Sequence, residues 1–406
     1  MTVVDISTKT VVCPKSSKRL FMLQDLDTTD SAILKALAIT AIALHNFFHL
    51  ITPVRQNEFS FSAARFTVFL NSVQHPTMAV QAFFAFFGHY GVQVFVFLSA
   101  YGLARTHWDQ DESWATFMWG RIRKLYPIFL VIVGGWAIGE AVLLGPLLFI
   151  KQMGLHLLLM LLGVSTLFGF SLPPIGPWWF IPFIIQFYAI WPLLRKLTHR
   201  YGWRLLLALS VLSMTLTAFA NPLLRHWSLN LLYTPIGRLP VLCLGIAAAR
   251  YPLRIRSSVA AVALALVLLG SHYAILWPLT LPSAAIVALW AYVEVRDSLR
   301  TFAWLRRLGE YSLLVFLLNG IVRNHSWLFV HSPWLQLLFG CTSVALSFAI
   351  AAAIHESLVS RPQAAKIPAK KRRPAAAVPT PDLPRAVGLP LGASISRASV
   401  QPVGAD

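Results

Sequence analysis

The chain has 406 residues, of which 57% are hydrophobic and 12% charged, and its formal net charge is +19. A soluble domain of this length needs far more charged surface, so the composition excludes that class. The basic residues lie in short loops and terminal segments without a nucleic-acid motif, which argues against a nucleic-acid partner. The three cysteines, Cys13, Cys243 and Cys341, are too far apart to indicate a disulfide framework or a metal site.

The apolar residues come in blocks of about 20, the length of helix that crosses ~30 Å of hydrocarbon. The sequence therefore predicts an all-α, polytopic helical membrane protein with about ten transmembrane helices. Residues 1–30 are polar and mixed, which predicts a cytosolic N-terminal arm without a cleaved signal peptide. The expected spans are 31–51, 79–104, 125–149, 178–194, 204–220, 229–249, 257–276, 283–295, 310–330 and 334–357.

Residues 152–172 are apolar and long enough to cross, but charge argues against a crossing. If they cross, the basic cluster at 195–204 falls on the outer face. If they are re-entrant or interfacial, that cluster and the later ones face the cytosol, as the positive-inside rule prefers. Both termini are then cytosolic. The transmembrane domain is expected at 31–358, followed by a disordered, basic, Pro/Ala-rich cytosolic tail at 359–406 that can touch anionic membrane lipid.

The first expected span carries polar residues that are costly in hydrocarbon. Lys35 lies near one end, and His45, Asn46 and His49 lie near the other. His45 is ~15 Å further along the helix than Lys35, and His45 and His49 share a helix face because they are four residues apart. One interpretation is a lysine that reaches the lipid headgroups, with two histidines in the interface. The other is a functional site, because ionisable residues inside spans usually mark one.

Four segments have a pattern that is similar to a known family. They are "LKALAITAIALHNF", "GVQVFVFLSAYGLART", "RIRKLYPIFL" and "PWWFIPFIIQFYAIWPLLRKL". In order and spacing they resemble the acyltransferase-3 family of integral membrane O-acyltransferases, which O-acylate cell-surface sugars and other acceptors. With weaker similarities further on, the resemblance covers residues 31–361.

The resemblance implies an enzyme of the cell inner membrane. Such an enzyme moves an acyl group, expected to be acetyl, from cytosolic acyl-coenzyme A to a hydroxyl of an exopolysaccharide, lipid-linked glycan or lipopolysaccharide. Acyl-coenzyme A is then a co-substrate, and no bound cofactor or metal is expected. His45 is the expected general base, because histidine can take a proton near neutral pH, and Lys35 and His49 complete the expected catalytic group.

Two further groups of residues follow from the resemblance, and each has a simpler alternative. Arg121, Arg123 and Lys124 are expected to bind the phosphates of the donor, or they are only anchors that set topology. The expected pocket residues are Trp179, Gln186 and Tyr188. The alternative for the tryptophan is a place in an interfacial aromatic belt.

The chain also departs from the family pattern at several positions. Lys35 stands where arginine is usual, and strict spacing would put Asn46 rather than His45 at the histidine position. The other departures are Gln93 for an aspartate, Ile184 and Ile185 for two glutamates, and Asn319 for a histidine. These departures leave open an inactive acyltransferase-like membrane protein. A separate alternative is a transporter or flippase for a lipid-linked glycan.

Overall fold

The computed structural model describes residues 21–168, 174–324 and 332–357, and throughout these ranges the regular structure is helical. The α-helices are α1 Thr28–Ile51, α2 Ala63–Val73, α3 Ala79–Phe87, α4 Gly91–Thr106, α5 Trp114–Leu144, α6 Pro146–Leu161, α7 Phe180–Tyr201, α8 Trp203–Thr215, α9 Asn221–Leu224, α10 Pro235–Arg250, α11 Ser257–His272, α12 Trp277–Leu299, α13 Ala303–Glu310, α14 Ser312–Asn324 and α15 Pro333–His355. The all-α prediction is confirmed.

Within the described residues, seven helical segments are long and apolar enough to cross a membrane, and three shorter apolar helices accompany them. The short ones are Pro146–Leu161, Ser257–His272 and Ser312–Asn324. This content confirms a polytopic helical membrane protein. The number of crossings and the cytosolic placement of the termini stay predictions. Residues 1–20 and 358–406, with nearly all of the expected tail, lie outside the described residues.

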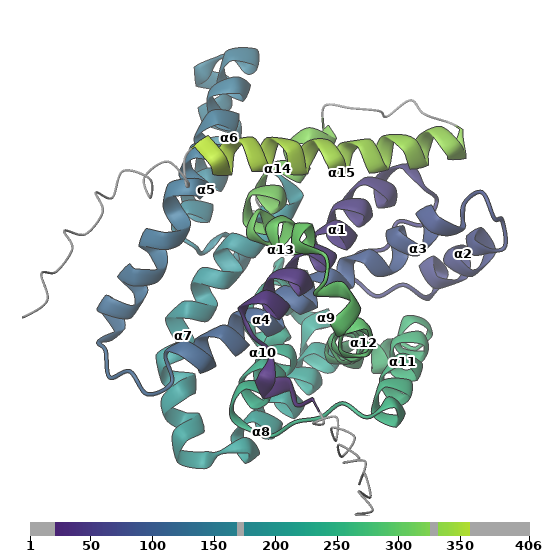
Figure 1. Ribbon diagram of the computed structural model, residues 1–406. Coiled ribbons are helices and arrows are strands. Elements are labelled where there is room, and N and C mark those ends of the chain that lie inside the picture. The colour runs from purple at the N-terminus through teal and green to yellow at the C-terminus, as the bar shows by residue number, and fades with distance from the viewer. Residues whose placement is uncertain (1–20, 169–173, 325–331, 358–406) are drawn as a thin grey trace, which may run out of the picture. The chain divides into compact units, whose positions relative to one another are not determined.

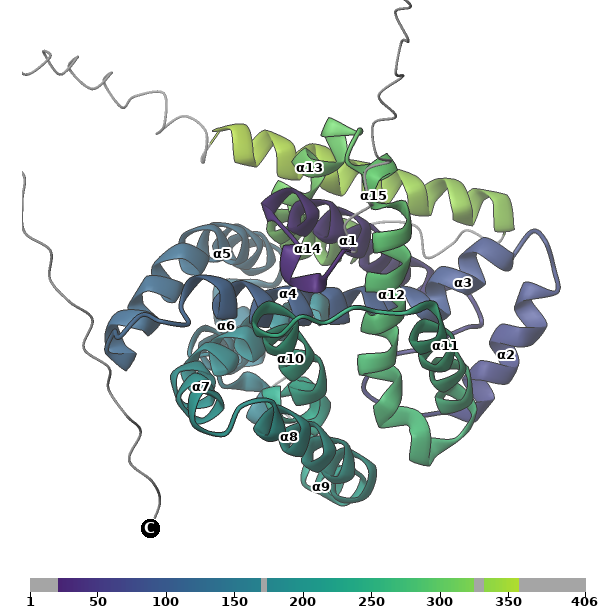
Figure 2. The ribbon, with the colours of Figure 1, turned by 60° about the horizontal axis from the view of Figure 1, so that its bottom comes forward.

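Helix α1 is the element around which the site is built. It packs against α3, α4, α13 and α14, and α4 packs in turn against α10. Figure 1 shows α15 lying across α1 and α14, which both contact it. Figure 2 shows α11 running beside α12, on the same side of the bundle as α2 and α3.

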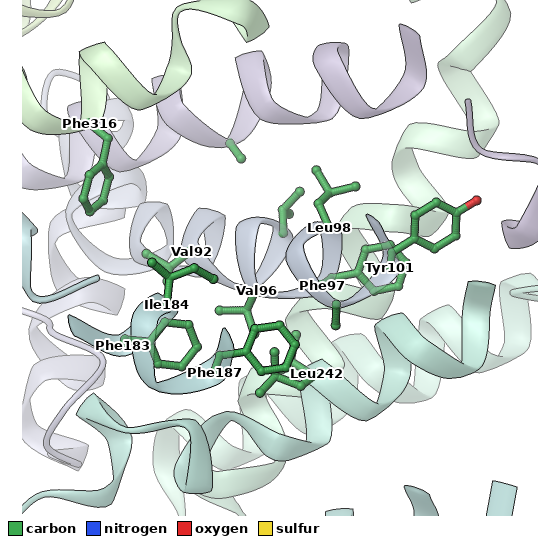
Figure 3. Close-up of a cluster of buried hydrophobic side chains, with 14 of the residues drawn as sticks. Val92, Val96, Phe97, Leu98, Tyr101, Phe183, Ile184, Phe187, Leu242 and Phe316 are labelled. Atoms are coloured by element: carbon green, nitrogen blue, oxygen red, sulfur yellow. The ribbon is translucent and has the colours of Figure 1, made fainter. Parts of the chain in front are cut away.

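The core between α4, α7 and α10 is made of hydrocarbon side chains. Val96 and Phe97 of α4 lie against Phe183 and Phe187 of α7, and all four side chains are fully buried (Figure 3). Ile184 belongs to the same cluster and is 4% exposed. A glutamate at this position would need a buried partner. The departure at Ile184 is therefore consistent with the surrounding packing.

The start of α1 is fixed by a network of charged groups. Asp27 and Asp30 form a reciprocal capping box, in which each side chain accepts a hydrogen bond from the other's backbone N–H. The fully buried Asp30 also accepts hydrogen bonds from Tyr292 at 2.7 Å and from Arg296 at 2.9 Å and 3.0 Å. Arg300 bonds both carboxylates. These contacts hold the first turn of α1 against the end of α12.

The expected span 125–149 was wrong at its end. The helix begins earlier, at Trp114, and stops at Leu144, because Gly145 has a φ of 85° and Pro146 starts a new helix. That helix, α6, has 16 residues and is ~24 Å long, which is too short to cross ~30 Å of hydrocarbon. Residues 152–172 are thus not one continuous helix.

The expected bounds of the two neighbouring spans 257–276 and 283–295 were also wrong. The expected short span 283–295 is part of a 23-residue helix, Trp277–Leu299, and the preceding helix already ends at His272. Pro278 lies in the first turn of α12, where the backbone N–H groups have no intrahelical partner, so a proline is tolerated there. Pro278 therefore starts this helix, and Pro282 lies inside it.

Candidate active site

A cavity of about 710 Å³ opens beside the C-terminal half of α1. The side chains around it are mostly polar or aromatic, unlike the hydrocarbon core beneath. Its lining residues are Ile42, His45, Asn46, His49, Leu50, Asn57, Glu58, Phe59, Ser60, His89, Val92, Pro174, Gly176, Pro177, Trp179, Arg225, Ser228, Asn230, Tyr233, Phe316 and Arg323. We call it the histidine cavity. A polar cavity of this size is the default candidate for a ligand site.

The hydrogen bonds of His45 determine which of its ring nitrogens is free. Its Nδ1 lies 3.1 Å from the carbonyl oxygen of Ala85 and 3.3 Å from that of Phe84. A carbonyl oxygen can only accept, so Nδ1 carries the hydrogen and donates it. The neutral ring therefore keeps its lone pair on Nε2. His45 is 6% exposed and lines the histidine cavity, so this nitrogen is the one that can take a proton from a bound group.

A glycine allows the two helices to approach closely enough for this contact. Gly88 begins a 3₁₀ turn, Gly88–Tyr90, that joins α3 to α4. A Cβ on Gly88 would lie 2.6 Å from the carbonyl oxygen of Ala41 and 2.8 Å from the Cβ of His45. Any larger residue would push α1 away and take His45 from its carbonyl partners.

Two further histidines lie next to His45. The His49 ring stacks on the His45 ring, with centroids 4.8 Å apart, and its Nδ1 donates to the His45 carbonyl oxygen at 3.0 Å. His89 meets His45 edge to face at 5.3 Å, and both of its buried nitrogens lack a hydrogen-bond partner among the described residues. Within residues 21–168, 174–324 and 332–357, no group of three or more histidine, cysteine or acidic side chains is placed to hold a metal ion.

The helix α14 holds the far side of this site in place. Asn46 donates to the side-chain oxygen of Asn319 at 3.2 Å, and Arg323 donates to the Asn46 carbonyl oxygen at 3.0 Å. Asn319 is 1% exposed. At the two positions where strict family spacing would have histidines, the chain thus has an amide pair that joins α1 to α14.

A buried ion pair lies in the wall of the histidine cavity. Glu58, from the segment after α1, is 2.9 Å from the Nη1 of Arg238 on α10, and neither side chain is more than 5% exposed. Gln93 of α4 donates to the same Glu58 oxygen at 3.2 Å. The Arg238 guanidinium lies over the Trp179 ring at 5.3 Å and donates from Nε to the Leu232 carbonyl oxygen. The site thus has a carboxylate beside Gln93, where the resemblance led us to expect an aspartate.

A second cavity, of about 160 Å³, lies further toward the start of α1. Lys35 lines it, and three of its residues, Ile42, Val92 and Phe316, also line the histidine cavity. The two cavities therefore adjoin across these three apolar side chains. Lys35 forms no ion pair with any residue that the structure describes.

The three expected donor-binding residues lie on α5, away from both cavities. Arg121 donates to Nε2 of His107, whose Nδ1 donates to Glu112 at 2.9 Å, and it lies over the Phe117 ring. Arg123 and Lys124 are exposed. Exposed cations can meet an anionic group that approaches from outside the helices, so their expected role stays a prediction.

The three expected pocket residues lie at different places, Trp179 just before α7 and Gln186 and Tyr188 on it. Trp179 precedes the helix and lines the histidine cavity. Gln186 donates instead to the Gly163 carbonyl oxygen at 2.9 Å and to the Thr166 hydroxyl at 2.8 Å, and so fixes the segment after α6. Tyr188 packs edge to face on Phe117, the same ring that lies under Arg121. Neither of these two lines the histidine cavity.

Sequence reasoning missed four residues at this site: Glu58, His89, Arg238 and Arg323. Arg238 carried a usable signal, because it lies inside the apolar segment 229–249 and ionisable residues within spans are rare. Glu58 is the only acidic residue between Asp30 and Asp109, but its pairing with a residue 180 positions later has no local signature.

A comparison with known protein families identifies the family of the chain. A family model described as an acyltransferase domain matches residues 30–356, which takes in α1, the histidine cavity and the helices up to α15. No curated protein and no solved structure gave a significant match. The match covers most of the chain, and the chain therefore belongs to the acyltransferase-3 family and is a membrane acyltransferase.

Proposed function

We propose that this acyltransferase transfers an acetyl group from cytosolic acetyl-coenzyme A to a hydroxyl of a surface or lipid-linked polysaccharide. The observation that carries the proposal is the tautomer of His45, whose Nδ1 donates to backbone carbonyls and leaves Nε2 as a base facing a polar cavity. Removing a proton from a hydroxyl is what O-acylation requires, and a positioned histidine supplies it.

The reaction that this geometry supports is a direct transfer. Nε2 of His45 takes the hydroxyl proton as the acceptor oxygen attacks the thioester carbonyl carbon. A C–O bond forms, the C–S bond breaks, and the coenzyme A sulfur leaves as a thiolate that takes up the proton. His49, stacked on His45, limits the movement of the ring during this exchange.

The adjoining cavities support a donor and an acceptor that meet from opposite ends of α1. The smaller cavity, beside Lys35, suits the narrow pantetheine arm of the donor, and the larger one suits a sugar. Lys35 has no acidic partner among the described residues, so its charge is available to a phosphate or a polarised carbonyl. Ile42, Val92 and Phe316 lie where the two substrates would meet.

The proposal predicts that the acetyl label is attached to the glycan through an ester bond. Purified protein in lipid nanodiscs would be incubated with acetyl-labelled acetyl-coenzyme A and membrane-derived glycan. We expect label in the glycan that hydroxylamine releases, because an ester reacts with hydroxylamine and an amide does not. Label that resists hydroxylamine would contradict O-acylation. Transport of unlabelled glycan into vesicles without any acyl transfer would favour a flippase instead.

The donor side has a separate test. If Arg121, Arg123 and Lys124 bind donor phosphates, replacing all three with glutamine should raise KM for acetyl-coenzyme A at least tenfold, because each charge-assisted contact contributes about 1.5–3 kcal/mol. The kcat should change less, since these side chains lie away from His45. The matched control is Arg204→Gln on α8, an exposed cation elsewhere in the bundle. An unchanged KM in a correctly inserted triple variant would make the three residues topology anchors only.

A further inference from the structure

The charge of the histidine cavity is strongly unbalanced. Among the described residues, Glu58 is the one acidic residue that lines this cavity, and its carboxylate is already paired with Arg238. Two further arginines, Arg225 and Arg323, line the cavity. Neither arginine has a carboxylate partner among the described residues. The two undescribed segments nearest to them in sequence, 169–173 and 325–331, contain no acidic residue.

The polar groups that the structure places in contact with Arg323 are uncharged, and Arg225 has another arginine, Arg65, near it. Arg323 donates to the Asn46 carbonyl oxygen and to the side-chain oxygen of Asn324, which are both uncharged acceptors. Arg225 lies in the turn before α10 and is exposed. A third arginine, Arg65, donates to the backbone and hydroxyl oxygens of Ser60, which itself lines the cavity. Arginines without carboxylates at the edge of a cavity create a positive potential that favours an anion.

The rest of the cavity suits a sugar ring. Phe59, Tyr233 and Trp179 line the cavity as a cluster, in which the Phe59 and Tyr233 ring centroids are 3.8 Å apart and those of Phe59 and Trp179 are 5.1 Å apart. Asn57 uses its side-chain oxygen to accept from Ser60 and from the backbone of Phe59, which leaves its amide hydrogens free to donate to a ligand hydroxyl or oxyanion. Aromatic walls with a few polar groups are the usual composition of a ligand site.

We propose that the acceptor bound in the histidine cavity is an anionic glycan, with a carboxylate or phosphate held by Arg225 and Arg323. This rests on the proposed function, because it assigns the acceptor of the same site. An arginine fork binds either oxyanion in two-point contact. The anion then orients the sugar so that a neighbouring hydroxyl lies within reach of Nε2 of His45.

The test measures binding, so it does not depend on turnover. The purified full-length chain, in nanodiscs of neutral phosphatidylcholine, would be titrated calorimetrically with methyl glucuronide, methyl glucoside and inorganic phosphate. We expect the glucuronide to bind at least tenfold more tightly than the glucoside at low salt, and the preference to weaken as salt rises. Arg225→Gln with Arg323→Gln should abolish the preference.

Two controls distinguish the role of Arg225 and Arg323 from a general loss of positive charge and from a loss of catalysis. Arg254→Gln with Arg256→Gln removes two exposed arginines next to Leu253, which bonds to Leu23 beside the start of α1, and should keep the preference. His45→Ala should keep the preference for glucuronide over glucoside, because both sugars offer the same hydroxyls to His45 and differ only in the anion, so the preference is tested separately from catalysis. Phosphate that binds through the same two arginines while the glucuronide does not would identify the oxyanion as phosphate and support the proposal. Equal binding of glucuronide and glucoside, a preference that survives in the Arg225/Arg323 variant, or no binding of either anion would overturn it.

Discussion

Replacing His45 with alanine is expected to lower the rate of acyl transfer by about 10²–10⁴-fold, the usual contribution of a general base. The protein should still insert and fold, because the ring donates one hydrogen bond and the substitution leaves the α1–α3 contact at Gly88 in place. The measurement is the initial rate of label transfer from acetyl-coenzyme A into glycan, normalised to the amount of inserted protein.

Two neighbouring substitutions serve as controls for the register of α1. His49→Ala should have a smaller effect, because its Nδ1 bonds only to the carbonyl oxygen one turn back and its ring supports His45 by stacking. Asn46→Ala should be milder still in kcat, since an amide cannot take a proton. An inactive Asn46→Ala with an active His45→Ala would mean that the base is at the strict family position and that His45 is structural.

Glu58→Gln is expected to destabilise the folded protein by about 3–5 kcal/mol, the cost of leaving one member of a buried ion pair alone. Arg238 is fully buried and cannot reach water to recover its solvation. The loss should appear as a lower thermal midpoint in detergent, together with reduced acyl transfer, because Glu58 also lines the histidine cavity.

A double variant that moves the carboxylate from position 58 to position 93 tests whether the charge pair itself accounts for the lost stability. Gln93 donates to the same Glu58 oxygen that pairs with Arg238, so a glutamate at 93 would put a carboxylate within the same cluster. We expect Glu58→Gln with Gln93→Glu to recover most of the lost stability. Glu140→Gln on α5, which removes a carboxylate outside the cavity, should change the midpoint little. If Glu58→Gln alone is as stable as the unaltered chain, the pair contributes no net stability.

Local patterns were sufficient to predict the class of fold and part of the site. The long apolar segments, the polar residues inside the first span and the order of four family-like segments all come from residues close together in sequence. The position of His45 deep in α1 follows from helix periodicity alone. The apolar length of 79–104 also predicted one span, although the structure divides it at the 3₁₀ turn Gly88–Tyr90.

Contacts between distant segments could not be predicted in the same way. The pairing of Glu58 with Arg238, and of Asn46 with Asn319, depends on how α1, α10 and α14 pack, and a single sequence carries no record of that packing. Gln186 was expected in the pocket from the family resemblance, but the sequence near Gln186 does not show which buried group its side chain bonds to. It bonds to the segment after α6. The late start expected for the span 283–295 has a local cause, since a proline such as Pro278 can occupy the first turn of a helix.

The contact at Gly88 has a consequence for the order in which the protein becomes active during synthesis. His45 enters the membrane on α1 before α3 can pack against it, because Phe84 and Ala85 lie about 40 residues further along the chain. Until α3 docks through Gly88, nothing in α1 itself selects which nitrogen of His45 carries the hydrogen. A partly assembled protein thus has the histidine but no defined base. We therefore expect α1 to have no acyltransferase activity until α3 has packed against it.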